Sequence, residues 1–149
     1  MKLENKEFGF DSFAAEMAKL KNEKHFDYLV TIVGEDFGEE GLGCVYILEN
    51  TQSHERISVR QLAKRVGQDN VVPSVFRLWA DANLLEREVY DFFGIKFLGH
   101  PDMRRLFLRN DFVGYPFRKD YDMSPEKNMY TLEDDVEVDE TMEWNLDEN

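Results

Sequence analysis

The chain has 149 residues with 18 basic and 31 acidic side chains, which give a formal net charge of -13 at pH 7. Such a negative protein repels phosphate backbones, so the charge argues against a nucleic-acid-binding protein. Its single cysteine excludes an internal disulfide, a four-cysteine zinc site and a self-contained iron–sulfur cluster.

The first predicted element is an amphipathic helix within residues 11–24. Phe13, Met17 and Leu20 recur at i, i+4 and i+7, which places them on one face. Either Asp11 or Ser12 is suited to cap its N-terminus. The opposite face is charged and is expected to contact solvent.

Three strands are predicted next, over residues 27–33, 43–50 and 55–62. The first two are β-branched and aromatic runs, "DYLVTIV" and "GCVYILEN", separated by a glycine-rich acidic stretch, which indicates a hairpin. Cys44 falls inside the second run and is expected to be a small core residue. Gly41 and Gly43 suggest a nucleotide-binding loop, but Tyr46 stands where that motif needs its third glycine.

A second helix is predicted from Ser74, as its cap, to Gly94, which suits the position after a helix C-terminus. A three-four spacing of apolar residues within it predicts one continuous face toward the core, formed by Val75, Leu78, Ala82, Leu85, Val89 and Phe92.

After Ile95 the periodicity ends, because glycine and proline interrupt short β-like runs. We expect at most two short strands there, near "IKFL" and "RRLFL". From Ser124 onward there are ten acids and one base, and few aliphatic residues. This tail should not be stable alone, although Met129, Tyr130, Met142 and Trp144 could dock on a partner.

These elements predict an α+β fold in one domain. It should contain an N-terminal helix, a mostly antiparallel or mixed sheet with a packed second helix, and an irregular C-terminal extension. The predicted boundaries are residues 1–121 for the domain and residues 122–149 for the acidic extension. No segment approaches the roughly 20 apolar residues of a membrane span, so a soluble cytoplasmic protein is expected.

The acids and the histidine near the second helix could suggest a metal site or an acid–base pair. The spacing does not support either, because Glu86 and Glu88 fall on different helix faces and no second histidine lies close by. "GHPD" is better explained as a turn in which Pro101 restricts His100 to extended backbone and Asp102 accepts backbone hydrogen bonds. No serine lies in a nucleophile elbow.

A basic and aromatic segment is the more informative feature. It interleaves Arg104, Arg105, Arg109, Arg118 and Lys119 with Phe107, Phe112, Tyr115, Phe117 and Tyr121. Planar guanidinium groups and rigid rings are typical of interface hot spots. Some of these arginines should pair internally with Glu86, Glu88 and Asp91, yet so many rings would be unfavourable in water. The segment is therefore predicted to be a docking surface for another protein.

Two stretches, "ANLLEREVYDFFGIKFLGHPDMRR" and "GYPFRKDY", closely resemble the 30 kDa subunit family, that is, the C subunit of NADH-quinone oxidoreductase (respiratory complex I). The family includes related subunits of membrane-bound hydrogenases. "PSVFRLW" and the strand pattern extend the resemblance over most of residues 11–121. Leu84, where the family usually has tryptophan, and Asp122, where it usually has proline, depart from the pattern.

The resemblance implies a non-catalytic structural or assembly protein in the hydrophilic arm of a proton-pumping complex. No catalytic, cofactor-binding or metal-binding residue is expected in this chain, since FMN and the iron–sulfur clusters would belong to other subunits. The D subunit, which forms much of the quinone site, would be the main partner, with the B and I subunits nearby. The chain would be peripheral on the cytoplasmic side of the inner membrane, which it would reach only through the complex.

On this resemblance, the acids and Arg87 of the second helix would cross-brace it to Arg104, Arg105 and the "RKDY" segment, and those segments would press on the D subunit. The residues expected to form the interface are Glu86, Arg87, Glu88, Asp91, His100, Pro101, Asp102, Arg104, Arg105, Tyr115, Pro116, Arg118, Lys119, Asp120 and Tyr121.

Two alternatives stay open. The same module could serve a membrane-bound hydrogenase or a complex with another electron donor. A free-standing metal-dependent enzyme would use Glu88, Asp91 and His100.

Overall fold

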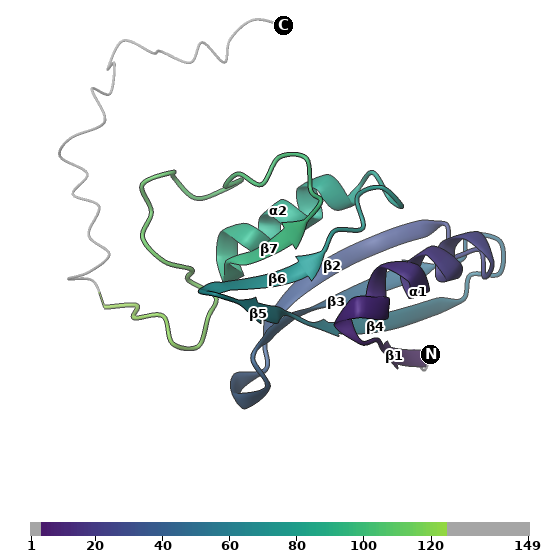
Figure 1. Cartoon of the computed structure of the whole chain (residues 1–149). Helices are drawn as coiled ribbons and strands as arrows, with labels where there is room; N and C mark the ends of the chain where they lie inside the picture. Colours follow the sequence, from purple (N-terminus) through teal and green to yellow (C-terminus); the bar gives the residue numbers. More distant parts are fainter. Residues whose placement is uncertain (1–3, 125–149) are drawn as a thin grey trace, which may run out of the picture.

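A computed structural model describes residues 4–124 of the chain. Within that range the elements follow in the order β1 (Glu4–Glu7), α1 (Phe10–Asn22), β2 (Tyr28–Asp36), the 3-10 turn η1 (Gly38–Glu40), β3 (Leu42–Glu49), β4 (Arg56–Leu62), β5 (Lys64–Val66), β6 (Asp69–Pro73), α2 (Ala82–Phe93) and β7 (Ile95–Leu98). The α+β class, the N-terminal helix and the packed second helix are confirmed (Figure 1).

A four-stranded sheet in the order β1-β4-β3-β2 forms the larger layer. The predicted hairpin is present, since β2 and β3 pair antiparallel, and β4 adds antiparallel to β3 as the third predicted strand. β1 joins the far edge in parallel with β4. This strand was not predicted, because "ENKE" has no apolar residue and forms a strand only through its neighbour.

The register of the sheet gathers its apolar residues on one face. Ile32 lies opposite Tyr46, and Tyr46 lies opposite Val59, in one buried row across three strands. Leu29 belongs to the next buried row. In a regular strand, residues an odd number of positions apart, such as Leu29 and Ile32, would point to opposite faces. An irregularity between Leu29 and Thr31 absorbs the extra residue and keeps both side chains on the inner face.

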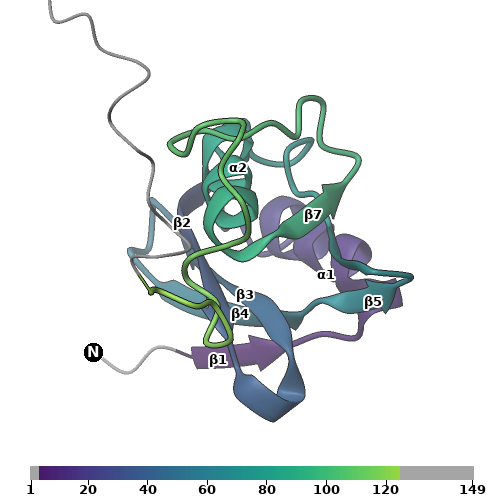
Figure 2. The same ribbon diagram turned by 90° about the vertical axis from the view of Figure 1, so that its left-hand side faces the viewer.

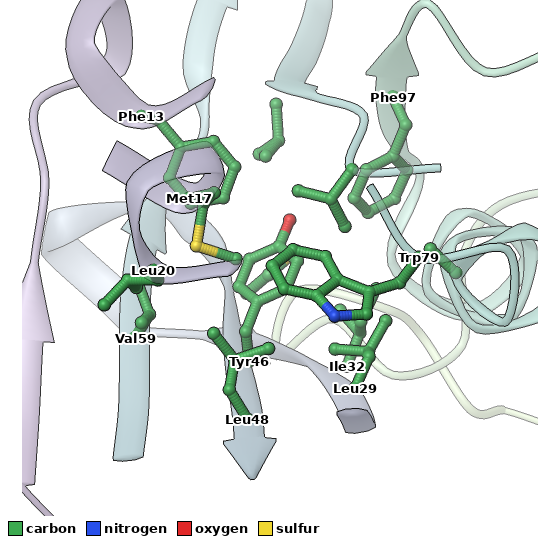
Figure 3. Packing of buried hydrophobic residues seen from close by; sticks show 14 of the residues in the cluster. Phe13, Met17, Leu20, Leu29, Ile32, Tyr46, Leu48, Val59, Trp79 and Phe97 are labelled. Atoms are coloured by element: carbon green, nitrogen blue, oxygen red, sulfur yellow. The ribbon is translucent and has the colours of Figure 1, made fainter. Parts of the chain in front are cut away.

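Both helices cover this inner face, with β7 between them (Figure 2). From α1, the predicted residues Phe13, Met17 and Leu20 are buried and point at the sheet (Figure 3). The ring of Phe13 lies 5.3 Å from that of Tyr46. Cys44 is fully buried in the same core, as its apolar surroundings in the sequence predicted.

The start of α1 differs from the prediction. Its N-cap is Gly9 rather than Asp11 or Ser12, and the backbone N–H groups of Ser12 and Phe13 both donate to the Gly9 carbonyl. Ser12 instead donates its side-chain hydroxyl to that carbonyl. The N-cap therefore lies two or three residues before the predicted positions, and Phe10 is the first residue of the helix.

The predicted start of the second helix was wrong by about two turns. Residues 75–81 form turns, and α2 begins at Ala82. The backbone N–H of Val75 donates to the Glu86 carboxylate at 2.7 Å, whereas a continuous helix would hold these residues about 16 Å apart. Ser74 is consequently not a helix cap, and its hydroxyl accepts a hydrogen bond from the Phe76 N–H instead.

A smaller sheet, in the order β5-β6-β7, lies beside α2. β7 confirms the strand expected at "IKFL", whereas β5 and β6 were not predicted. The strand expected at "RRLFL" is absent from the described residues, because three consecutive N–H groups of that run point at one carboxylate. In a strand, alternate N–H groups point in opposite directions.

None of the helices within residues 4–124 has both the length and the apolar character needed to cross a lipid bilayer. The domain boundary expected at residue 121 stays a prediction. The expected docking residues Met129, Tyr130, Met142 and Trp144 lie outside the described residues.

Candidate functional site

Glu86 occupies the interior between α2 and the turns that precede it. Its side chain is fully buried, and it accepts hydrogen bonds from the Ser74 hydroxyl and the Val75 N–H, both at 2.7 Å. Burial raises the pKa of Glu86 to about 7, against the opposing effect of these two hydrogen bonds. Through these two hydrogen bonds the carboxylate holds the start of the segment 74–81 against α2.

His100 is a structural hydrogen-bonding residue in the turn that follows β7. Its Nδ1 accepts the Asp102 N–H at 3.0 Å, so the ring proton is on Nε2, which lies 3.0 Å from the carbonyl oxygen of Asn83. The ring is fully buried, 4.0 Å from the Glu86 carboxylate. The imidazole thus ties the "GHPD" turn to the first turn of α2.

Arg87 braces α2 to the coil that follows β7. Its Nε donates to the Arg104 carbonyl at 3.1 Å and its Nη2 to the Arg105 carbonyl at 2.9 Å. Within residues 4–124 the guanidinium donates to backbone oxygens and forms no ion pair with an acidic side chain. Arg104 itself pairs at the surface with Asp102, at 2.7 Å for both hydrogen bonds.

Asp91 organises the next part of the coil. One of its oxygens accepts the N–H groups of Leu106, Phe107 and Leu108, while the other accepts Nη1 of Arg105 at 3.0 Å. Burial alone would raise the pKa of Asp91, but these hydrogen bonds hold it below its ordinary value. Asp91 is consequently a buried anion in a cradle of backbone amides.

Arg105 and Arg118 hold Tyr115 between them. The ring of Tyr115 lies 5.1 Å from the guanidinium carbon of Arg105 and 4.6 Å from that of Arg118. Arg105 also donates to the carbonyls of Phe112 and Gly114, and Arg118 donates to that of Phe93. Arg105 thus stabilises the coil from within, with its side chain 12% exposed, and Arg118 joins the coil to the end of α2.

An aromatic column of Phe107, Phe92 and Phe117 lies on the outer side of the coil and α2. Phe92 stacks on Phe117 at 4.3 Å between ring centres and on Phe107 at 5.8 Å. Phe107 is 65% exposed and Phe117 is 58% exposed. Two large rings are thus held rigidly in solvent, which is typical of a surface that another protein covers.

Other predicted residues lie at the margins of this surface. Lys119 and Asp120 are exposed, and the Lys119 N–H donates to Asp36 at 2.9 Å. The ring of Tyr121 stacks on Phe112 at 6.1 Å. Pro101 is exposed and Pro116 half-buried in the turns that position His100 and Phe117.

The brace expected from Glu88 is not formed, because this side chain makes no hydrogen bond or ion pair within residues 4–124. It is exposed and borders a groove between β2 and α2. Nor are Glu88, Asp91 and His100 gathered into a metal site. The described part of the chain has no group of three or more histidine, cysteine, aspartate or glutamate side chains placed to hold a metal ion.

Sequence reasoning missed the contribution of β2 to this region. A β-carbon at Gly34 would lie 2.5 Å from the Phe93 ring and 3.0 Å from Val89, so glycine permits the close packing of α2 on β2. The signal was present, since a glycine inside a β-branched strand often marks the close approach of another segment.

The comparisons with known proteins agree on one family. The family described as "Respiratory-chain NADH dehydrogenase, 30 Kd subunit" matches residues 10–127. The C/D subunit of NADH-quinone oxidoreductase from Phocaeicola vulgatus is 50% identical over 86% of this chain and 24% of its own length. The chain thus spans about a quarter of such C/D relatives. The C subunit from Moorella thermoacetica is 38% identical over 78% of each chain.

Two solved structures resemble the chain in both sequence and fold. A trypsin-resistant fragment (1-134) of Nqo5 matches with a TM-score of 0.59 and 37% identity, over 64% of this chain and 79% of that one. One polypeptide of the membrane-bound sulfane sulfur reductase, an archaeal respiratory membrane complex, matches with a TM-score of 0.72 and 27% identity, over 91% of this chain and 85% of that one.

Proposed function

The chain belongs to the 30 kDa subunit family of respiratory-chain NADH dehydrogenase, and on that premise we propose that it is a structural component of a membrane-associated NADH:quinone oxidoreductase. It acts in the hydrophilic arm of the complex and packs against the D subunit, with the B and I subunits nearby. Electron transfer from NADH to quinone, and the proton pumping coupled to it, belong to the assembly. This chain supplies a rigid surface, and the cofactors lie in other subunits.

The observation that carries the proposal is the exposed aromatic column. Phe107 and Phe117 remain more than half exposed although Phe92 fixes both of them by stacking. The part-buried hydrogen bonds from Arg105 to Asp91 and from Arg118 to the Phe93 carbonyl hold the coil in one conformation, which lowers the entropy that binding must remove. The combined C/D name of the Phocaeicola relative supports the D subunit as the partner that covers the column.

Purification of the tagged chain from solubilised membranes tests the proposal. The D, B and I subunits and the NADH-binding subunits should be recovered together with it, and the complex should reduce quinone with NADH. Recovery of the chain as a monomer that converts a bound substrate by itself would contradict the proposal.

A second candidate is the equivalent component of a complex that takes electrons from another donor. The match to the sulfane sulfur reductase polypeptide supports this alternative, because it covers 91% of this chain. The same purification decides between the two. Recovery of homologues of the D subunit without NADH-binding subunits, and with no NADH-dependent quinone reduction, would favour the second.

A further inference from the structure

A groove of about 190 Å³ runs between β2 and α2. It is lined by residues 31–34 of β2, by Glu88, Val89, Phe92 and Phe93 of α2, and by Phe117. Successive residues of a strand point to opposite faces of a sheet, so four consecutive residues can line one groove only along the edge of the strand. The backbone edge of β2 therefore forms one wall of the groove.

β2 is an edge strand of the four-stranded sheet and, in the described part of the chain, pairs only with β3. An edge strand presents unpaired N–H and C=O groups at alternate residues, and proteins usually cover or charge such an edge. Here the edge strand β2 is nine residues long, and Val33, one of its residues, is 49% exposed. The edge can accept another extended segment.

Glu88 supplies the only charge among the residues that line this groove. The other two acids of α2, Glu86 and Asp91, are fully buried and hydrogen-bonded internally. Glu88 is exposed, has no ionic partner within residues 4–124, and lies one turn from Leu84 on one side and from Phe92 on the other. A carboxylate between apolar side chains is complementary to a lysine or arginine that arrives with apolar neighbours.

We infer that an extended segment of another subunit lies along the edge of β2 as an added strand, places an apolar side chain in the groove and pairs an arginine or lysine with Glu88. Main-chain hydrogen bonds would give affinity and the groove would give specificity, as in other strand-addition complexes. A second copy of this chain fits less well, since it would bring the same carboxylate to the same edge. The inference rests on the proposed function and assigns a second contact surface to the chain.

Site-specific crosslinking tests the inference in the assembled complex. A photo-crosslinking amino acid is placed at position 33 of the tagged chain and, as a matched control, at position 66, because Val66 is similarly exposed (53%) but lies on β5. Position 33 should capture one other subunit, within a segment that carries a basic residue, and position 66 should not capture that segment. Capture of a second copy, of lipid alone, or of nothing at position 33 would overturn the inference.

Charge reversal gives an independent measurement. Glu88→Arg should reduce the amount of chain recovered in the complex about tenfold, while Glu39→Arg, at another exposed acid, should not. Glu88→Gln should have an intermediate effect. Thermal unfolding of the purified variants should match that of the unmodified chain, which separates lost docking from lost folding. A basic residue mapped by the crosslink and changed to aspartate should restore incorporation of Glu88→Arg.

Equal incorporation of the Glu88 and Glu39 variants would overturn the inference. If the D, B and I subunits still copurify in that case, the proposed function stands and only the strand-addition surface is wrong. If the unmodified chain recovers no other subunit, the proposed function itself fails.

Discussion

At the scale of single residues, the three acids of α2 have different environments. Glu86 contacts the turns before the helix, Asp91 contacts the coil after β7, and Glu88 borders the β2 groove. Their neighbours, and not their chemical type, determine whether each carboxylate is charged, paired or free to meet a partner.

The raised pKa of Glu86 predicts a specific dependence of stability on pH. The folded pKa of about 7 exceeds the ordinary value of 4.5, so the folded state binds the proton more tightly than the unfolded state. The stabilisation is complete below about pH 4.5 and is lost as the pH rises toward 7. Between pH 5 and pH 8, Glu86 should lower the free energy of unfolding by up to about 3 kcal/mol.

Glu86→Gln should remove this contribution, because glutamine does not titrate. The measurement is the free energy of unfolding in urea at several pH values, for the unmodified chain and the variant. As the pH rises, the free energy of unfolding of the unmodified chain should fall relative to that of the variant. A difference that is constant from pH 5 to pH 8 would show that Glu86 titrates normally.

Asp91→Asn should be among the more damaging single substitutions. The amide group of asparagine has one oxygen and one NH2, so in either orientation the NH2 faces donors, either the three N–H groups or Arg105, and the Arg105 charge loses its buried anionic partner. The expected loss is about 3 kcal/mol in the free energy of unfolding. Asp102→Asn is the control, and its exposed pair with Arg104 should contribute less than about 1 kcal/mol.

At the scale of elements, the end of α2 and the coil packed on it depend on Gly94. This residue has φ of 70°, and its N–H donates to the Tyr90 carbonyl as the sequence predicted for a helix end. A β-carbon there would lie 2.5 Å from the Tyr115 ring and 2.6 Å from the Arg118 guanidinium. Backbone conformation and tertiary packing therefore both require glycine.

Gly94→Ala should destabilise the chain by more than the conformation alone explains. A left-handed conformation costs an alanine about 1 kcal/mol, and displacement of Tyr115 and Arg118 adds to that. Gly67→Ala is a matched control, since Gly67 has φ of 61° with open space around it. Urea unfolding should show a clearly larger loss in the free energy of unfolding for Gly94→Ala than for Gly67→Ala. Equal losses would mean that Tyr115 and Arg118 move away from the added methyl group without an energetic cost.

At the scale of the whole molecule, interior contacts determine which apolar groups remain outside. The inner face of the sheet receives both helices, and Arg105 and Arg118 of the coil donate to backbone carbonyls, while Phe107 and Phe117 face solvent. Their exposure is built into the fold, because Phe92 and the Asp91 cradle fix the positions of both rings.

Phe107→Ser should separate stability from assembly. Loss of one stacking contact costs about 1 kcal/mol, so the isolated chain should still fold. Recovery of the tagged chain in the membrane complex should fall several-fold, since the removed ring belongs to the proposed docking surface. Val66→Ser removes a side chain of comparable exposure on β5 and should leave recovery unchanged. Equal recovery of both variants would exclude Phe107 from the interface.

The sequence by itself determined the features that depend on neighbours a few residues apart. The buried stripe of α1, the β2–β3 hairpin and the glycine at the end of α2 follow from local periodicity and backbone preference, and the family motif lies within one continuous stretch. Tertiary structure alone decided where α2 begins, why "RRLFL" is coil, and which acid faces outward. Each of these depends on a hydrogen bond between groups more than ten residues apart, and such a bond produces no periodic pattern in the sequence.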